Sequence, residues 1–191
     1  MATIVVTQFI SLDGVVEAPG GEPGYAHTGW VSWTPGDDHF AYKLEETLTH
    51  DALLIGRKTY ESFAGAWPSR SGEFADKVNS MPKYVVSRTL TRVDWNNSSL
   101  VHGDVPAAVV RLKQSLPGNI LVAGSRTLVA TLMAHDLVDE YRLMIFPVVL
   151  GSGARLFADS PDAHRLRLTH TQSFPTGVVV LTYEPLSRAT A

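Results

Sequence analysis

Three short stretches of the sequence bring together residue types that bind anions. In each, an apolar run is followed by one or two small residues, then by arginine and, directly or after a lysine, by threonine. An arginine guanidinium presents a fork of N–H donors that matches phosphate oxygens. The chemistry that these stretches favour is therefore the binding of an anion. They are Gly56-Arg57-Lys58-Thr59, Ser87-Arg88-Thr89 and Gly124-Ser125-Arg126-Thr127.

One such stretch alone carries little information, because many solvated surface turns contain arginine and lysine without a ligand. Three stretches change the expectation if their apolar runs are strands of a parallel sheet, since the carboxyl ends of such strands share an edge, where ligands bind. A helix that starts at this edge adds unpaired N–H donors and the positive end of its dipole. We therefore expect a ligand with several phosphates, such as a nicotinamide dinucleotide with an additional ribose phosphate.

The elements that would position these corners alternate between strand and helix, which predicts a largely parallel sheet with right-handed crossovers. The first helix has Asp37 or Asp38 as its N-cap and Phe40, Leu44 and Leu48 at apolar spacing. The other expected elements are strands at 3–10, 52–55, 83–86, 98–101 and 119–123, and helices at 57–63, 73–79, 105–116 and 125–134.

The last part of the sequence has a different pattern. A long apolar strand is expected at 140–149, with a bulge or break at Pro147, because proline cannot donate to a sheet ladder. Two more strands at 166–173 and 177–183 form an antiparallel hairpin at the sheet edge. The predicted fold class is α/β, with a mixed, mostly parallel central sheet flanked by helices and a C-terminal antiparallel hairpin.

Five further residues are candidates for the substrate side of a site. Asp13 lies in the turn after the first strand, and Asp38 opens the first helix, so both are candidate catalytic acids. Trp33, Phe40 and Trp67 offer aromatic surfaces to a planar substrate. Each has an equally reasonable structural alternative, because the acids suit turn and helix caps and the aromatic residues suit a core. The loop 17–35, rich in glycine and proline, is long enough to be functional.

Composition narrows the possible functions. The chain has 191 residues, a net charge of -3, and no cysteine. The small net charge gives no reason to expect nucleic acid or a membrane as partner. The absence of cysteine excludes disulfides and thiolate chemistry. The seven histidines have no ligand spacing, so no metal site is predicted. We expect a cytoplasmic protein with one domain, residues 1–185, and a disordered tail, 186–191.

Several segments resemble the dihydrofolate reductase-like superfamily, and in particular the reductase domain of the riboflavin-biosynthesis deaminase-reductases in a stand-alone form. The resemblance extends from residue 4 to about residue 184. The segments that carry it are Ser11-Leu12-Asp13-Gly14, residues 54–62, residues 82–90, Gly124-Ser125, Leu137-Val138-Asp139-Glu140 and residues 147–153.

The resemblance implies a dihydrofolate reductase-like fold and NADPH as cofactor. By the family pattern, Arg57, Lys58 and Thr59, with Ser87 and Arg88, hold the adenosine 2′-phosphate end of NADPH. Gly124 and Ser125 cradle its pyrophosphate. Relatives often pair, which implies a homodimer. The implied activity is NADPH-dependent reduction of a small heterocyclic substrate, possibly 5-amino-6-(5-phosphoribosylamino)uracil of riboflavin biosynthesis.

Two departures from the family pattern bear on the substrate. In true dihydrofolate reductases an acid on the first helix binds the pterin, but Phe40 stands near that position here and Asp37 and Asp38 fall short of it. Folate reduction is therefore disfavoured. A lysine common on the first strand of the riboflavin-pathway reductases is replaced by Thr7 or Gln8. The alternative to an enzyme is a dinucleotide-binding protein without catalysis, acting as a sensor or interaction module.

Overall fold

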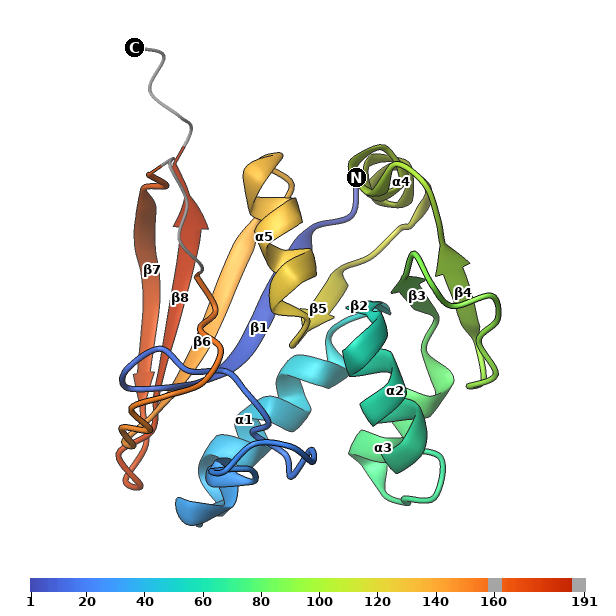
Figure 1. The fold of residues 1–191 in the computed structure, drawn as a ribbon. Coiled ribbons are helices and arrows are strands. Elements are labelled where there is room, and N and C mark those ends of the chain that lie inside the picture. The colour runs from blue at the N-terminus through green and yellow to red at the C-terminus, as the bar shows by residue number, and fades with distance from the viewer. Residues whose placement is uncertain (158–162, 187–191) are drawn as a thin grey trace.

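A computed structural model describes residues 1–157 and 163–186. Within this part of the chain, eight strands form one sheet in the order β4-β3-β2-β5-β1-β6-β8-β7 (Figure 1). The strands β1 to β6 all run parallel to one another, and β8 is antiparallel to both β6 and β7. The bounds are β1 Ile4–Ser11, β2 Ala52–Gly56, β3 Lys83–Val86, β4 Ser98–Val101, β5 Ile120–Ala123, β6 Glu140–Phe146, β7 Leu166–Ser173 and β8 Val179–Pro185.

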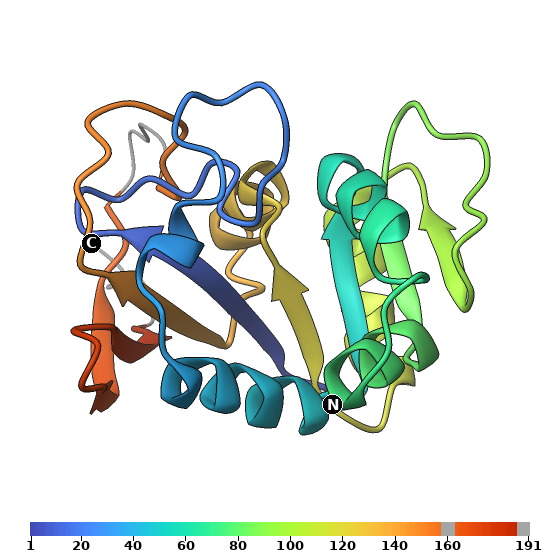
Figure 2. The ribbon, with the colours of Figure 1, turned by 90° about the horizontal axis from the view of Figure 1, so that it is seen from below.

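Helices cover both faces of the sheet. Alternate strand residues such as Val5 and Leu121 pack with α2 and α3, whereas Ile4 and Val122 pack with α4 and α5. Figure 2 shows α1 and α3 along one side of the strands. The bounds are η1 Trp30–Trp33, α1 Asp37–Leu48, α2 Arg57–Ala66, α3 Glu73–Ser80, α4 Val105–Ser115 and α5 Arg126–Ala134. None of the helices in the described segments is both long and apolar enough to cross a membrane.

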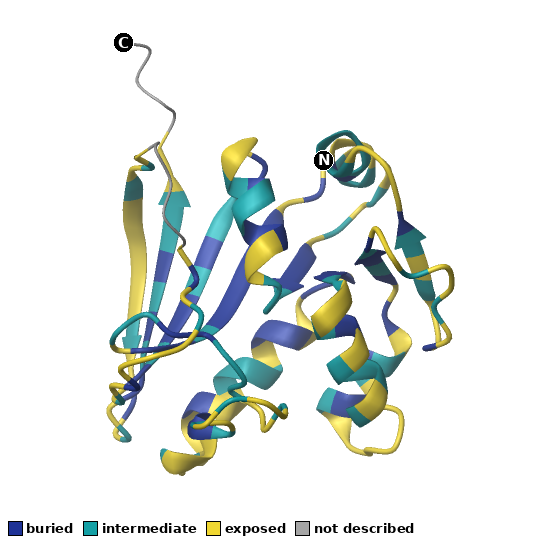
Figure 3. Cartoon of the chain, in the orientation of Figure 1, coloured by how far each residue is buried: buried dark blue, intermediate teal, exposed yellow. Residues whose placement is uncertain are grey.

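The predicted fold class and the order of elements are confirmed. Expected and observed strands agree within a few residues, and burial is concentrated on the central strands, with β7 exposed (Figure 3). The strand β6 ends at Phe146, so Pro147 breaks it, as expected from the missing proline N–H. The disordered tail predicted from residue 186 lies, apart from Leu186, outside the described residues.

The helix α1 is confirmed, but its spaced apolar residues do not form its buried face. Phe40 is 42% exposed and Leu48 37% exposed, whereas His39 and Glu46 are buried against the sheet. The sheet surface beneath α1 carries polar groups, including Thr7, so a polar helix face is the complementary one. The N-cap was also assigned to the wrong residue, because it is Gly36 rather than either aspartate. A Cβ atom at Gly36 would lie 2.3 Å from the Thr176 methyl carbon, which leaves room only for glycine.

A buried lysine fixes the start of β3, the strand that leads to the second Arg-Thr corner. The Lys83 side chain is fully buried, and its Nζ donates to the backbone carbonyls of Asn79 and Met81, both at 2.8 Å, and of Asn96, at 2.9 Å. The ammonium also lies 4.3 Å from the centroid of the Trp95 ring. Burial lowers the pKa of Lys83 to about 8. This side chain therefore ties α3 to the loop that precedes β4.

Candidate functional site

The three Arg-Thr corners lie at one edge of the sheet, as predicted. They follow β2, β3 and β5, which are neighbours in the order β3-β2-β5 and run parallel. Figures 1 and 2 show α2 and α5 beginning beside the ends of β2 and β5. The third strand, β3, is followed by a turn rather than a helix. Parallel strands thus bring residues 56–59, 87–89 and 124–127 to the same side of the molecule.

Ser125 joins the corners after β2 and β5. Its Oγ accepts a hydrogen bond from the Gly56 backbone N–H at 2.9 Å and donates one to Thr59 Oγ1, also at 2.9 Å. Ser125 is the N-cap of α5 but makes no side-chain cap hydrogen bond to that helix. The first N–H groups of α5 are therefore left for another acceptor, as an anion site at a helix N-terminus requires.

The backbone at this junction leaves little room for side chains. Gly124 and Ser125 both have left-handed conformations, with φ of 58° and 59°. A Cβ atom at Gly124 would lie 3.1 Å from Thr59 Oγ1. The combination of a positive φ and this close approach favours glycine at position 124. The result is a stretch of bare backbone at the start of α5.

The corner after β3 is held by a serine as well. Ser87 Oγ accepts hydrogen bonds from the backbone N–H groups of Thr89 at 3.1 Å and Leu90 at 2.9 Å. Ser87 is buried, whereas Arg88 and Thr89 are exposed. The Ser87 hydroxyl therefore shapes the turn, and the exposed residues after it face solvent.

The cations at the three corners differ in their surroundings. Arg57 Nη1 forms an ion pair with Glu61 one turn along α2, at 3.0 Å, and both side chains are roughly half exposed. Lys58, Arg88 and Arg126 are exposed, and they form no ion pair with any residue in the two described ranges. Arg57 thus already has an anionic partner, whereas the positive charge of the other three is uncompensated.

Asp13 connects two loops. Its carboxylate accepts hydrogen bonds from Ser11 Oγ at 2.7 Å and from the backbone N–H groups of Leu150 at 3.1 Å and Gly151 at 2.8 Å. The Ser11 bond is the main cause that lowers the pKa of Asp13 to about 2, while burial acts in the opposite direction. These hydrogen bonds stabilise the ionised carboxylate. A catalytic role for Asp13 stays a prediction.

The other substrate-side candidates are spread over the molecule. Asp38 lines a groove of about 450 Å³ between α1 and the turn from β7 to β8. Trp67 follows the last residue of α2, about 15 Å from Arg57 along the ten-residue helix, and packs against Phe74 with ring centroids 4.9 Å apart. Trp33 is 54% exposed. The substrate roles of Trp33, Asp38, Phe40 and Trp67 stay predictions.

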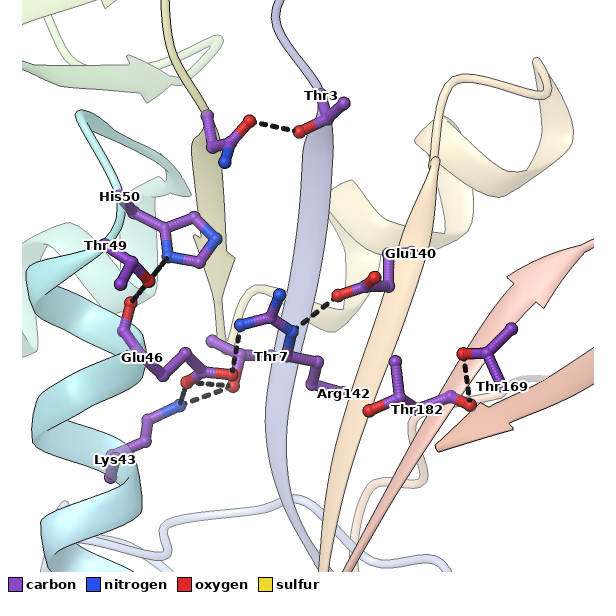
Figure 4. A network of polar contacts seen from close by, with 11 residues as sticks. Thr3, Thr7, Lys43, Glu46, Thr49, His50, Glu140, Arg142, Thr169 and Thr182 are labelled. Carbon is purple, nitrogen blue, oxygen red and sulfur yellow. Dashed lines mark hydrogen bonds and ion pairs between the residues drawn. The ribbon is translucent and has the colours of Figure 1, made fainter. Parts of the chain in front are cut away.

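The inner face of α1 carries charged residues that the sequence prediction missed. Glu46 is 3% exposed, and its Oε2 accepts hydrogen bonds from Thr7 Oγ1 at 2.8 Å and from Lys43 Nζ at 2.5 Å (Figure 4). Arg142 Nη1 on β6 lies 3.9 Å from the other carboxylate oxygen. The sequence contained an indication of this polar face, because residues spaced three or four apart lie on one side of a helix. The residues with this spacing are His39, Lys43, Glu46 and His50.

Buried polar atoms without partners gather around β1 and α1. Within the described residues they include Gln8 Oε1, Glu46 Oε1 and the Nε2 atoms of His39 and His50. Burial lowers the pKa values of both histidines, which favours their neutral forms. The structure therefore keeps unpaired hydrogen-bonding capacity beside the first strand.

The fold defines a dihydrofolate reductase-like class of protein. A dihydrofolate reductase from Enterococcus faecalis, solved in complex with NADP(H), is 13% identical to this chain over 96% of each chain, with a TM-score of 0.64. A putative riboflavin biosynthesis protein from Shewanella sp. PV-4 is 22% identical over 97% of this chain and 99% of its own, with a TM-score of 0.75. Both similarities show the fold.

The sequence assigns the chain within this class. Residues 2–180 match the sequence model of the RibD C-terminal domain, and the chain therefore belongs to the RibD C-terminal domain family. The YyaP protein of Bacillus subtilis is 32% identical over 185 residues, which cover 94% of this chain and 93% of YyaP. The resemblance inferred from the motifs is thus confirmed.

Proposed function

We propose that this protein is an NADPH-dependent oxidoreductase that reduces a small heterocyclic compound, with an aminouracil riboside of riboflavin biosynthesis as the leading candidate. The observation that carries the proposal is the meeting of the Arg-Thr corners at one sheet edge, with Ser125 bonded to both Gly56 and Thr59. Membership of a reductase family supports the same conclusion.

The residues at the junction of β2 and β5 fit a dinucleotide pyrophosphate. A Cβ atom at Gly124 would lie 3.1 Å from Thr59 Oγ1, and the glycine instead leaves its backbone uncovered there. The N–H groups that open α5 and the positive end of its dipole favour an anion at this point. Gly124, Ser125, Arg126 and Thr127 would therefore hold the pyrophosphate.

The corners after β2 and β3 fit an additional phosphate. Lys58 and Arg88 are exposed cations without an ion-pair partner in the described parts of the chain, and Arg57 can exchange its surface carboxylate for a phosphate. Thr59 and Ser87 support the backbone around them. These groups would hold the 2′-phosphate, which distinguishes NADPH from NADH. Such contacts are equal in the ground state and the transition state, so they contribute to cofactor binding rather than to turnover.

The chemistry that the cofactor supplies when bound is hydride transfer, so the protein has to bind, orient and exclude water. The arrangement of α1 argues against folate as substrate. Phe40 stands near the position of the pterin-binding acid, and the buried carboxylate of α1 belongs to Glu46, almost two turns further along the helix. That carboxylate is already bonded to Lys43 and Thr7. We therefore favour an aminouracil over a pterin.

The test of this proposal is NADPH oxidation with a panel of purified substrates. We expect loss of the reduced-nicotinamide absorbance with 5-amino-6-(5-phosphoribosylamino)uracil and little or none with 7,8-dihydrofolate. Deuterium placed on the nicotinamide should appear in the product. Tight NADPH binding without turnover of any substrate would support a dinucleotide-binding protein without catalysis, and the absence of NADPH binding would reject both functions.

A further inference from the structure

Lys43, Glu46 and Thr7 form a closed triangle of hydrogen bonds between α1 and β1. Lys43 Nζ donates to the Thr7 hydroxyl and to Glu46 Oε2, and the Thr7 hydroxyl donates to the same carboxylate oxygen at 2.8 Å. The side chains of Lys43 and Glu46 are only 13% and 1% exposed. A buried ion pair is a weak source of stability, because desolvation offsets the attraction between the charges. Its presence here therefore calls for a functional explanation.

The triangle lies at the level where the neighbouring strand ends. Thr7 pairs with Ala123, the last residue of β5, and the next residue is Gly124 of the proposed pyrophosphate site. Neighbouring strands lie about 4.8 Å apart. Figure 4 shows Lys43 reaching from α1 toward Thr7, close to the end of β5. The ammonium is thus next to the proposed site, on the sheet face that α1 covers.

One proton of the ammonium is directed away from the triangle. An ammonium has three N–H donors, and Thr7 and Glu46 take two of them. No further acceptor for Lys43 occurs in the part of the chain that the structure describes. Lys43 Nζ also lies 5.2 Å from the centroid of the Phe9 ring. Phe9 is two residues further along β1, toward the carboxyl edge, and it is partly exposed. The ammonium therefore lies beside the Phe9 ring, on the side of the triangle that faces the carboxyl edge of the sheet.

We propose that Lys43 is the catalytic proton donor of this reductase and that its substrates contain a polarised C=N or C=O bond. This inference rests on the proposed NADPH-dependent activity. In the reduction, the substrate carbon accepts a hydride from the reduced nicotinamide, which is oxidised. The electron pair of the double bond moves to the nitrogen or oxygen, and this atom takes a proton from Lys43. Solvent then returns a proton to the neutral amine, so atoms and charges balance.

Glu46 and Thr7 are positioning residues in this scheme. Glu46 and Thr7 accept hydrogen bonds from Lys43 Nζ and so fix the position of the ammonium. A second pair, Arg142 and Glu140, lies beside them with Nε and Oε1 2.5 Å apart, so the whole cluster is electrically neutral. A charged reacting group would find no compensating net charge in this cluster and would pay a desolvation cost, whereas a neutral imine or carbonyl would not.

The test compares two lysines in similar surroundings. Lys43→Met removes the proposed donor, and Lys113→Met is the matched control, because Lys113 is 14% exposed and also forms a 2.5 Å ion pair, with Asp139 on the other side of the sheet. The probes are the cyclic imine 2-methyl-1-pyrroline and 5-amino-6-(5-phosphoribosylamino)uracil. For Lys43→Met we expect kcat to fall by about 10²-fold or more with unchanged NADPH affinity, and for Lys113→Met no such loss.

Two further variants separate catalysis from folding. The double variant Lys43→Met with Glu46→Gln removes both buried charges, so it avoids an unpaired carboxylate, and it should be folded and equally slow. Glu46→Gln alone removes a hydrogen-bond acceptor that positions the ammonium, so kcat should fall while NADPH affinity stays unchanged. A purely structural ion pair would lower stability without this selective loss of kcat.

The outcomes distinguish this inference from the proposed function. If Lys43→Met or the folded double variant keeps the wild-type kcat, Lys43 is not the donor, and the proposed function stands. If wild-type protein binds NADPH but reduces neither probe, the assigned substrate class is wrong. If it does not bind NADPH, the proposed function fails and this inference fails with it.

Discussion

Replacing Arg57 by alanine should weaken NADPH binding selectively. A hydrogen bond to a charged phosphate contributes about 1.5–3 kcal/mol. Arg57 must give up its ion pair with Glu61 to make that contact, and a half-exposed pair one helical turn apart contributes about 0.3–0.5 kcal/mol. The net loss is about 1–2.5 kcal/mol, which corresponds to roughly 5- to 70-fold in affinity. NADH lacks the phosphate, so its dissociation constant should not change.

Calorimetric titration of each variant with NADPH and with NADH provides the assay. Arg167→Ala is the matched control, because Arg167 also forms a surface ion pair, with Glu184 at 2.6 Å, and lies on β7 at the opposite end of the sheet. At saturating NADPH the turnover of Arg57→Ala should equal that of wild type. Equal NADPH affinities of Arg57→Ala and wild type would refute the assignment of this corner to the 2′-phosphate.

Three further changes test the supports of the site. Ser125→Ala leaves the Gly56 N–H without its acceptor, and we expect a loss of about 1–3 kcal/mol in unfolding free energy, measured in urea, together with weaker NADPH binding. Asp13→Asn should remove the fall in stability between about pH 4 and pH 2, because the lowered pKa of Asp13 stabilises the fold only above this range; an unchanged acid-unfolding curve would contradict this. Lys83→Met leaves the backbone carbonyls of Asn79, Met81 and Asn96 without the Lys83 donor, so thermal unfolding should show a loss of at least about 3 kcal/mol, whereas the partly exposed Lys77→Met should change little.

The convergence of the three Arg-Thr corners could be predicted from sequence because strand ends are locally encoded. Short apolar runs ending in glycine or serine identify β2, β3 and β5, and parallel connectivity then places their ends at one edge. The ion pair of Arg57 with Glu61 also follows a local rule, since residues four apart on a helix are neighbours. Local rules therefore suffice for the part of the site built from strand-to-helix turns.

The face of α1 could not be predicted by the same rules. Apolar spacing selected Phe40, Leu44 and Leu48, but the sheet beneath α1 presents Thr7 and Arg142 and so favours the polar face of the helix. Which polar side chains meet across β1 and β6 depends on the sheet order, not on any local pattern. The contacts of Asp13 with residues 150–151 are equally distant in sequence, so its turn could be predicted and its partners could not.

The central claim is that the converging corners bind a dinucleotide carrying an additional phosphate. The most direct measurement is a calorimetric titration of the wild-type protein with NADPH and with NADH under identical salt. Because at least one charge-assisted contact distinguishes the two, we predict that NADPH binds more tightly by roughly 10- to 150-fold. Equal dissociation constants for the two cofactors would contradict the account.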